Sequence, residues 1–118
     1  MKKMLVLAVL AALLIAGCDI FPTTYDIKYE ITGTASSVSI TMNNAGDNTE
    51  QMSNVSIPWE KSFSVLVKKS EYYFAYVSAQ NRGPSGSVTA RIYVDGKVFK
   101  ESTSSGAYVI ATASGSVK

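Results

Sequence analysis

The stretch Tyr25-Asp26-Ile27-Lys28-Tyr29-Glu30-Ile31 alternates apolar and charged side chains without an exception. A period of two residues places the apolar set on one face of a β-strand and the charged set on the other face. Antiparallel sheets commonly have one face on a core and one face in solvent. The stretch therefore predicts a half-buried strand, and it sets the fold class expected for the chain around it.

The same period recurs along the rest of the chain, and turn residues interrupt it roughly every ten residues, a spacing typical of sandwiches and barrels. Further strands are expected at residues 38–42, 55–57, 63–67, 72–79, 88–94, 98–99 and 107–113. Residues 43–48 are expected to form a turn, and residues 102–106 a polar loop. The sequence predicts an all-β fold: a single antiparallel immunoglobulin-like β-sandwich of about seven to eight strands. The likeness to immunoglobulin domains is architectural only, because the Cys-Trp-Cys set of antibody domains is missing.

Two of these segments leave alternatives open. Residues 72–79 are apolar at both parities, which indicates either a central strand or an outer face kept apolar for a partner. Asp95-Gly96 predicts a hairpin turn, and a three-residue loop that pairs Ile92 with Val98 is favoured over a two-residue turn that pairs Ile92 with Phe99.

The N-terminus has the pattern of a secretory signal. Two lysines are followed by thirteen uncharged residues, 4–16, and then by Gly17 and Cys18. Thirteen residues are too few to span a bilayer, which takes about 20. An aliphatic residue, two small residues and a cysteine resemble the bacterial lipobox, which implies cleavage before Cys18 and a diacylglycerol on its sulfur. The alternative is a plain signal peptide with an incidental cysteine.

The expected organisation is a signal peptide at 1–17, a lipidated cysteine and short tether at 18–24, and one β-sandwich domain at 25–118. The tether after Cys18 reaches at most about 20 Å, so the domain is expected close to the extracytoplasmic face of the cell membrane. Asp19 resembles the inner-membrane retention signal of enteric bacteria, a rule limited to that group, so the choice between inner and outer membrane stays open.

Composition argues against several function classes. The chain has no histidine, and its only cysteine is the one expected to be acylated. The commonest general base and metal ligand, and every Ser-His or Cys-His pair, are therefore missing. Lys2 and Lys3 leave with the signal, and the remaining charges balance, so a basic footprint for nucleic acid is absent. We expect no catalytic residues, no metal, no cofactor and no nucleic-acid partner.

Three aromatic residues are the candidates for contact with a partner. Trp59, next to Pro58, is interpreted either as a plug of the core or as an anchor for a partner, since tryptophan is enriched at binding hot spots. Tyr72 and Tyr76 occupy the second parity of their strand. More often, tyrosines of this kind frame a sandwich with rings inside and hydroxyls outside.

The charged residues have simpler interpretations. Asp26 and Glu30, with Lys28 between them, are expected on a solvated strand face rather than in a cation or acid–base site. Asp95 is expected in a turn rather than in a calcium site. The pair at 68–69, two lysines, could face anionic lipid, but protection of a strand edge is the favoured interpretation.

Four segments resemble the extracytoplasmic domain of the small mycobacterial membrane proteins, the MmpS family. The segments are Tyr-Glu-Ile-Thr-Gly at 29–33, Asn-Val-Ser-Ile-Pro-Trp at 54–59, Arg-Ile-Tyr-Val-Asp-Gly-Lys-Val at 91–98 and Gly-Ala-Tyr at 106–108. The resemblance implies a β-sandwich outside the membrane and an accessory role beside large lipid- and siderophore-exporting transporters. Two features differ. The family has an uncleaved membrane helix where this chain has a lipobox, and a cysteine pair where this chain has Ala90 and Ala111 or Ala113.

The function expected from these features is that of a membrane-anchored lipoprotein acting as a non-catalytic interaction or accessory module of the cell envelope, in contact with an envelope or transporter protein. The alternative is a small lipoprotein that binds or sequesters a ligand through its tyrosine-rich strands. A large apolar pocket between the sheets would favour the alternative, and a flat exposed aromatic patch would favour the interaction module.

Replacing Cys18 by serine removes the expected acceptor of the lipid. Stable anchoring takes two acyl chains, because one chain binds a membrane only marginally. We therefore expect Cys18→Ser to leave the membrane fraction or to remain unprocessed, as measured by membrane fractionation and intact mass. An unchanged fractionation and an unchanged mature mass would contradict the lipoprotein assignment.

Overall fold

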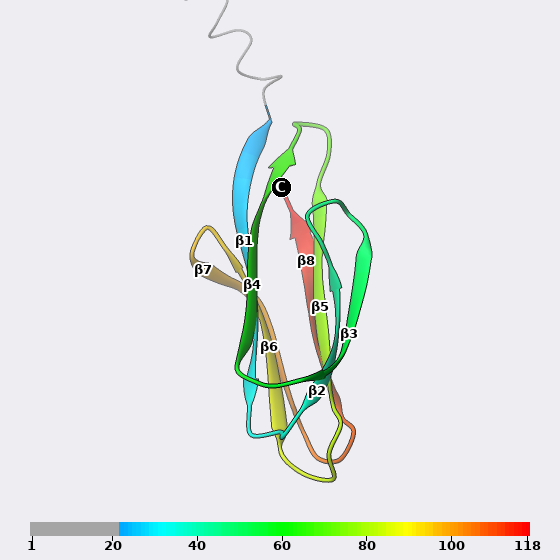
Figure 1. Cartoon of the computed structure of the whole chain (residues 1–118). Coiled ribbons are helices and arrows are strands. Elements are labelled where there is room, and N and C mark those ends of the chain that lie inside the picture. Colours follow the sequence, from blue (N-terminus) through cyan, green and yellow to red (C-terminus); the bar gives the residue numbers. More distant parts are fainter. Residues whose placement is uncertain (1–21) are drawn as a thin grey trace, which may run out of the picture.

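The computed structural model describes residues 22–118, and this part of the chain folds into eight antiparallel β-strands arranged as two facing sheets (Figure 1). The strands are β1 (Thr23–Gly33), β2 (Val38–Asn43), β3 (Thr49–Val55), β4 (Trp59–Val67), β5 (Tyr73–Asn81), β6 (Ser87–Val94), β7 (Lys97–Ser105) and β8 (Ile110–Val117). One sheet has the order β4-β1-β6-β7 and the other β3-β2-β5-β8. The predicted all-β sandwich is confirmed.

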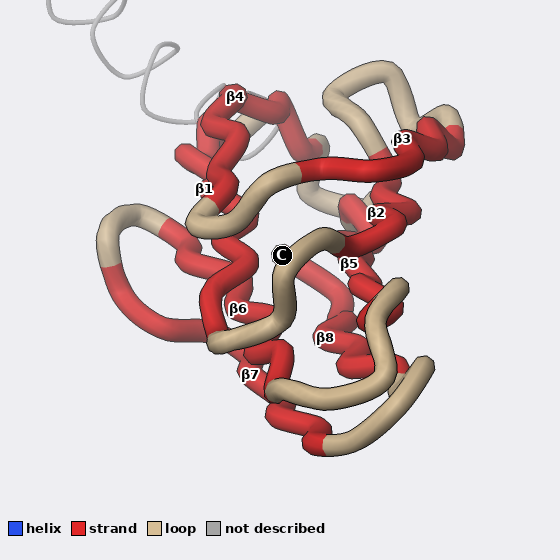
Figure 2. The backbone as a smooth tube through the Cα atoms, turned by 60° about the horizontal axis from the view of Figure 1, so that its bottom comes forward, coloured by secondary structure: helices blue, strands red, loops and turns tan. Residues whose placement is uncertain are grey.

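The likeness to immunoglobulin domains is one of architecture. An immunoglobulin sheet carries the first, second, fifth and fourth strands of the chain, whereas the corresponding sheet here carries the first, fourth, sixth and seventh. Viewed towards one end, the two sheets form two columns, with β7 beside β8 at one margin and β3 and β4 at the other (Figure 2). At the β7–β8 margin a Cβ on Gly115 would lie only 2.8 Å from Cε2 of Phe99, so the missing side chain lets β7 pack closely on β8.

The core consists of the inward positions of the alternating strands. In β1 the alternation predicted from the sequence is observed, with Ile27, Tyr29 and Ile31 buried. The central strands β2, β5 and β6 follow the same pattern, and β4 and β8 bury only part of their length. The edge strands β3 and β7 have no fully buried residue. Packing of six strands therefore fills the space between the sheets, without a disulfide in the described residues.

The elements that differ from the sequence-based prediction are mostly polar. The third strand occupies Thr49–Val55 rather than 55–57, and Ser102–Ser105 belong to β7 rather than to a loop. An edge strand needs few apolar residues, because it contributes little to the core. In β7 the ladder is reinforced by a hydroxyl pair, Thr89 Oγ1 and Thr103 Oγ1, at 2.8 Å. The last strand begins at Ile110 instead of residue 107, after a turn in which Tyr108 has a φ of 57°.

The hairpin between β6 and β7 has neither of the expected pairings. Asp95 and Gly96 both have positive φ, and Val94 pairs with Lys97, so the turn has two residues. A register shift next to Tyr93 then pairs Ile92 with Lys100. Two hydrogen bonds to Asp26 hold Asp95 in its left-handed conformation. The carboxylate of Asp95 accepts from the N–H of Asp26 at 2.8 Å, and the N–H of Asp95 donates to the carbonyl of Asp26.

Tyr29 connects the two sheets. Its side chain is fully buried and extends from β1 into the core. The hydroxyl donates to the carbonyl of Asn43 on β2 at 2.7 Å. The same oxygen lies 3.2 Å from the hydroxyl of Tyr73 and accepts the N–H of Tyr76, both on β5. Tyr73 in turn reaches the carbonyls of Asn43 and Asn44. Phe63 of β4 packs edge-on against both tyrosine rings.

Gly33 and Gly96 provide a matched test of why glycine is needed at a positive φ. Gly33 has a φ of 135°, and a Cβ there would lie 2.2 Å from the backbone oxygen of Ser87, whereas a Cβ on Gly96 meets nothing within 4 Å. We expect Gly96→Ala to lower the free energy of unfolding by about 1–2 kcal/mol, from conformation alone. Gly33→Ala should cost roughly 3 kcal/mol or more, because a backbone overlap is added. Urea unfolding measures both, and equal costs would contradict the close approach of β1 to β6.

The Tyr29–Tyr73 pair predicts a loss of stability at alkaline pH. Burial raises the pKa of Tyr29 above the usual 10.0 and also raises the pKa of Tyr73, because the charged form is poorly solvated. The folded state then keeps its protons while the unfolded state releases them. The stability from this pair is fully present below pH 10 and decreases as the pH rises above it.

Urea midpoints measured from pH 8 to pH 11 test this expectation. Tyr29→Phe should be less stable than the parent at neutral pH by roughly 1–3 kcal/mol, because the carbonyl and N–H partners lose their hydrogen bond. The same variant should lose less additional stability above pH 10. Tyr72→Phe, at an exposed tyrosine, is the control and should follow the parent. Identical alkaline profiles for Tyr29→Phe and the parent would contradict the expectation.

Candidate functional site

A row of exposed aromatic side chains lies on the outer face of β5 and just before it. Tyr72 is 65% exposed and Phe74 is 43% exposed, while Tyr76 is half-buried. The rings of Phe74 and Tyr76 are stacked, with centroids 6.3 Å apart and an interplanar angle of 29°. Tyr73, Ala75 and Val77 alternate with them and are buried, so the interpretation of residues 72–79 as a central strand is confirmed, while a role of the outer face in partner contact stays a prediction. The segment is a central strand from Tyr73 onwards, and its outer side carries aromatic residues. Tyr72, Phe74 and Tyr76 are called the aromatic row below.

A shallow cleft of about 480 Å³ adjoins the row. Phe74 and Tyr76 form one side of it, and Thr41, Asn43, Asp47 and Thr49 form the rest. The amide of Asn43 donates to the carboxylate of Asp47 and to the carbonyl of Phe74, both at 2.7 Å. These two hydrogen bonds hold the β2–β3 turn against the start of β5, so the wall of the cleft is fixed.

The outer faces of the two sheets differ sharply in charge. On the β4-β1-β6-β7 sheet, Arg91 bridges Glu30 and Glu101 at 3.3 and 2.8 Å, and the ammonium of Lys28 lies 4.4 Å from the ring centroid of Tyr93. On the other sheet, the outward positions of the three strands β2, β5 and β8 contain no charged residue. These positions are Ser39, Thr41, Asn43, Phe74, Tyr76, Ser78, Gln80, Ile110, Thr112, Ser114 and Ser116.

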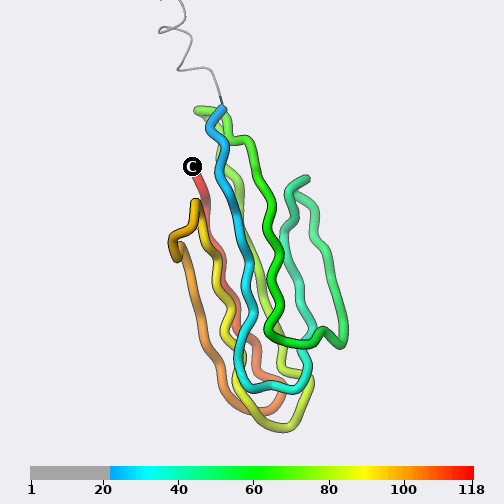
Figure 3. Tube along the Cα trace, turned by 60° about the vertical axis from the view of Figure 1, so that its left-hand side comes forward, coloured from blue at the N-terminus to red at the C-terminus, as the bar shows by residue number. Residues whose placement is uncertain are grey.

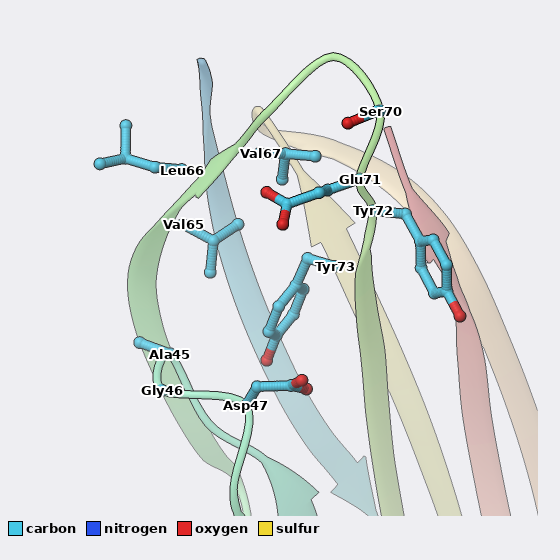
Figure 4. Close-up of a pocket in the computed structure, with 10 residues that line it drawn as sticks. All are labelled: Ala45, Gly46, Asp47, Val65, Leu66, Val67, Ser70, Glu71, Tyr72 and Tyr73. Carbon is cyan, nitrogen blue, oxygen red and sulfur yellow. The ribbon is translucent and has the colours of Figure 1, made fainter.

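A second cleft, of about 490 Å³, lies at the end of the sandwich where β1 begins. Figure 4 shows Val65, Val67 and Tyr73 around its floor, with the carboxylate of Glu71 turned towards them. Tyr72 also lines this cleft, and in the same view its ring is turned to the side opposite Leu66. This cleft is open to solvent, and so are the clefts beside the aromatic row and along β1 and β4.

Of the three predicted partner residues, the structure brings two together. Tyr72 and Tyr76 belong to the aromatic row. Trp59 lies elsewhere, at the first position of β4 opposite Ile31, where it is half-buried and packs against the core. This placement matches the interpretation of Trp59 as a plug and separates it from the row.

The charged candidates have structural partners. Asp26 accepts a hydrogen bond from Ser64, and Glu30 binds Arg91 and the hydroxyl of Tyr93. Asp95 accepts from the backbone of Asp26 within its hairpin. Among residues 22–118, no three carboxylate, histidine or cysteine side chains group in the way that a metal ion would need.

Cys18 and the preceding signal segment lie outside the described residues, so their assignment stays a prediction. Over the part that the structure describes, no helix has the length and apolar character needed to cross a bilayer.

Phe74 and Asn43 are the functional candidates that sequence reasoning missed. In the sequence Phe74 has the same parity as Tyr72 and Tyr76, and this parity was a signal that could have identified it. Asn43 was assigned only to a turn, because nothing in a single sequence shows that its amide would contact β5.

The comparison with known protein families extends over nearly the whole chain. The family model described as Mycobacterium membrane protein matches residues 4–117. The match begins within the apolar N-terminal run and ends in the last strand, so it includes every strand of the sandwich. No individual curated protein matches this sequence. The resemblance drawn from the strand segments is therefore confirmed, and the chain belongs to the Mycobacterium membrane protein family.

Proposed function

We propose that this protein is a membrane-anchored lipoprotein, held by lipid on Cys18 at the extracytoplasmic face, that acts as a non-catalytic accessory module by docking on another envelope protein. Membership of a membrane protein family supports membrane association. The resemblance to the MmpS family adds a partner class, a large membrane transporter. The observation that carries the proposal is the aromatic row on the uncharged outer face of the β3-β2-β5-β8 sheet.

The composition of this face supports a protein partner. The core of a protein–protein interface is depleted in charged residues and enriched in tyrosine, tryptophan and phenylalanine. The face of β2, β5 and β8 shares the lack of charge, and Phe74 and Tyr76 are its aromatic residues, whereas the opposite face pairs its charges in the way of a solvated surface. Phe74 and Tyr76 are already held in place by stacking and by the backbone contacts of β5, so little side-chain freedom is lost when a partner covers them.

The position of the row supports a partner within the membrane. Tyr72 precedes the first residue of β5, and Tyr73 pairs with Val117 near the end of the sandwich where β1 begins. Figure 3 shows the start of β1, the β4–β5 loop and the end of β8 at the same end of the molecule. With β1 starting at Thr23, a chain anchored at Cys18 has only about 17 Å of extended backbone before the sandwich. The aromatic row therefore lies on the side of the domain, close to the membrane surface.

The alternative role, ligand binding, predicted a large apolar pocket between the sheets. The clefts described above are open and partly polar, and the inward side chains of the central strands are fully buried. The interaction module is therefore favoured over ligand sequestration.

Site-specific photo-crosslinking in intact cells tests the proposal. A photoreactive phenylalanine analogue in place of Tyr76 should crosslink to an integral membrane protein, identified by mass spectrometry. The matched control is the same analogue in place of Tyr93, a half-buried tyrosine on the outer face of the charged sheet. Phe74→Ala should weaken the crosslink, since truncation of a central aromatic anchor typically costs 2 kcal/mol or more.

Two results would contradict the proposal. Equal crosslinking from positions 76 and 93 would show that the uncharged face is not the interface. Recovery of lipid and self-contacts alone, together with a tightly bound small molecule in the purified domain, would favour the ligand-binding role.

A further inference from the structure

The end of the sandwich where β1 begins carries exposed apolar side chains and lysines together. Leu66 is 69% exposed and Tyr72 is 65% exposed. Leu66 pairs with Thr24 in the ladder, so it lies level with the first residues of the domain. Lys68 and Lys69, in the loop between β4 and β5, are exposed, and so is Lys118 after β8. The group comes from two parts of the chain, residues 66–72 and Lys118, and Figures 1 and 3 show the β4–β5 loop and the end of β8 at the same end of the molecule.

The acidic side chain of the loop, Glu71, is exposed as well, so the loop carries two lysines and one carboxylate. Figure 4 shows the carboxylate of Glu71 turned inward, towards Val67 and Tyr73, while Leu66 and Tyr72 point outward on opposite sides. The loop is closed by a hydrogen bond from the N–H of Glu71 to the carbonyl of Lys68. The loop therefore presents two lysines between two outward apolar groups.

We propose that this end, consisting of Leu66, Lys68, Lys69, Tyr72 and Lys118, is a lipid-contact surface that rests on the bilayer and fixes the orientation of the domain. Tyrosine is enriched at the interface between lipid and water, and lysine stems extend along apolar surface while their ammonium groups reach the lipid phosphates. This composition fits a membrane surface with anionic lipid.

Because the chain is attached to the membrane, even a weak contact is sufficient to keep this end of the domain on the bilayer. This step rests on the proposed anchor at Cys18. Four residues, 19–22, separate Cys18 from β1, so the contact between lipid and the end of the domain where β1 begins is intramolecular. A short linker of this kind gives an effective concentration in the millimolar range. A surface that would bind a membrane only marginally by itself can then stay in contact with it.

Two exposed tyrosines at opposite ends provide the test. Tyr108 is 57% exposed and lies in the turn before β8, at the end of the sandwich far from the start of β1. Cys18 is the only cysteine of the chain, so in lipidated protein a cysteine introduced by Tyr72→Cys or Tyr108→Cys is the one reactive thiol. Each variant is labelled with an environment-sensitive fluorophore and reconstituted into vesicles of phosphatidylethanolamine and phosphatidylglycerol that contain a nitroxide-labelled lipid.

The probe at position 72 should shift its emission to shorter wavelength and lose most of it to the nitroxide, while the probe at position 108 keeps its emission. Replacing phosphatidylglycerol by phosphatidylcholine should weaken the quenching at position 72, and unchanged quenching would overturn the role of the lysines. No greater quenching at 72 than at 108 would overturn the proposal and leave this end to a protein partner. Flotation of the same vesicles distinguishes a failure of the anchor, because unanchored protein would not float with the lipid.

Discussion

The hydroxyl of Tyr29 is the contact on which the arrangement of the two sheets most depends. The side chain of Tyr29 extends from β1 across the core. Its hydroxyl donates to the carbonyl of Asn43 on β2 and accepts a hydrogen bond from the N–H of Tyr76 on β5. Without this hydroxyl the N–H of Tyr76 would lose its hydrogen bond to Tyr29, and an unsatisfied buried donor costs its full desolvation, so the phenol fixes where β1 faces β2 and β5. Because the described part of the chain has no disulfide, the register between the sheets rests on this contact and on apolar packing.

The same contact links the core to the surface proposed for binding. The backbone N–H of Tyr76 donates to the hydroxyl of Tyr29, and the ring of Tyr76 stacks on Phe74. Asn43, whose carbonyl accepts from Tyr29, holds the wall of the adjoining cleft through its amide. A rigid core therefore positions the aromatic row directly. At the opposite end the buried Asn81 has a comparable role, since its amide donates to the carbonyls of Ser85 and Gly106 and joins two loops.

The sequence allowed the two-layer β fold, the inward set of β1 and the outward position of Tyr72 and Tyr76 to be predicted, because all three follow from a period of two residues. The polar edge strands β3 and β7 were misplaced, since their register is set by a neighbouring strand and not by their own apolar pattern. The hairpin at Asp95 depended on a hydrogen bond to Asp26, a residue far away in the chain. The difference in charge between the two outer faces was also beyond the sequence, because it requires knowing which strands share a sheet.

The central claim is that the uncharged face of β5 is covered in the envelope while the charged face of β1 and β6 stays in water. Carbene footprinting of the purified protein and of intact cells compares the two faces directly, with Tyr76 and Tyr93 as reporters of similar burial on opposite sheets. The account predicts that Phe74 and Tyr76 are labelled in the purified protein and protected in cells, while the labelling of Tyr93 is the same in both. Protection of Tyr93, or equal labelling of Phe74 and Tyr76 in both preparations, would contradict it.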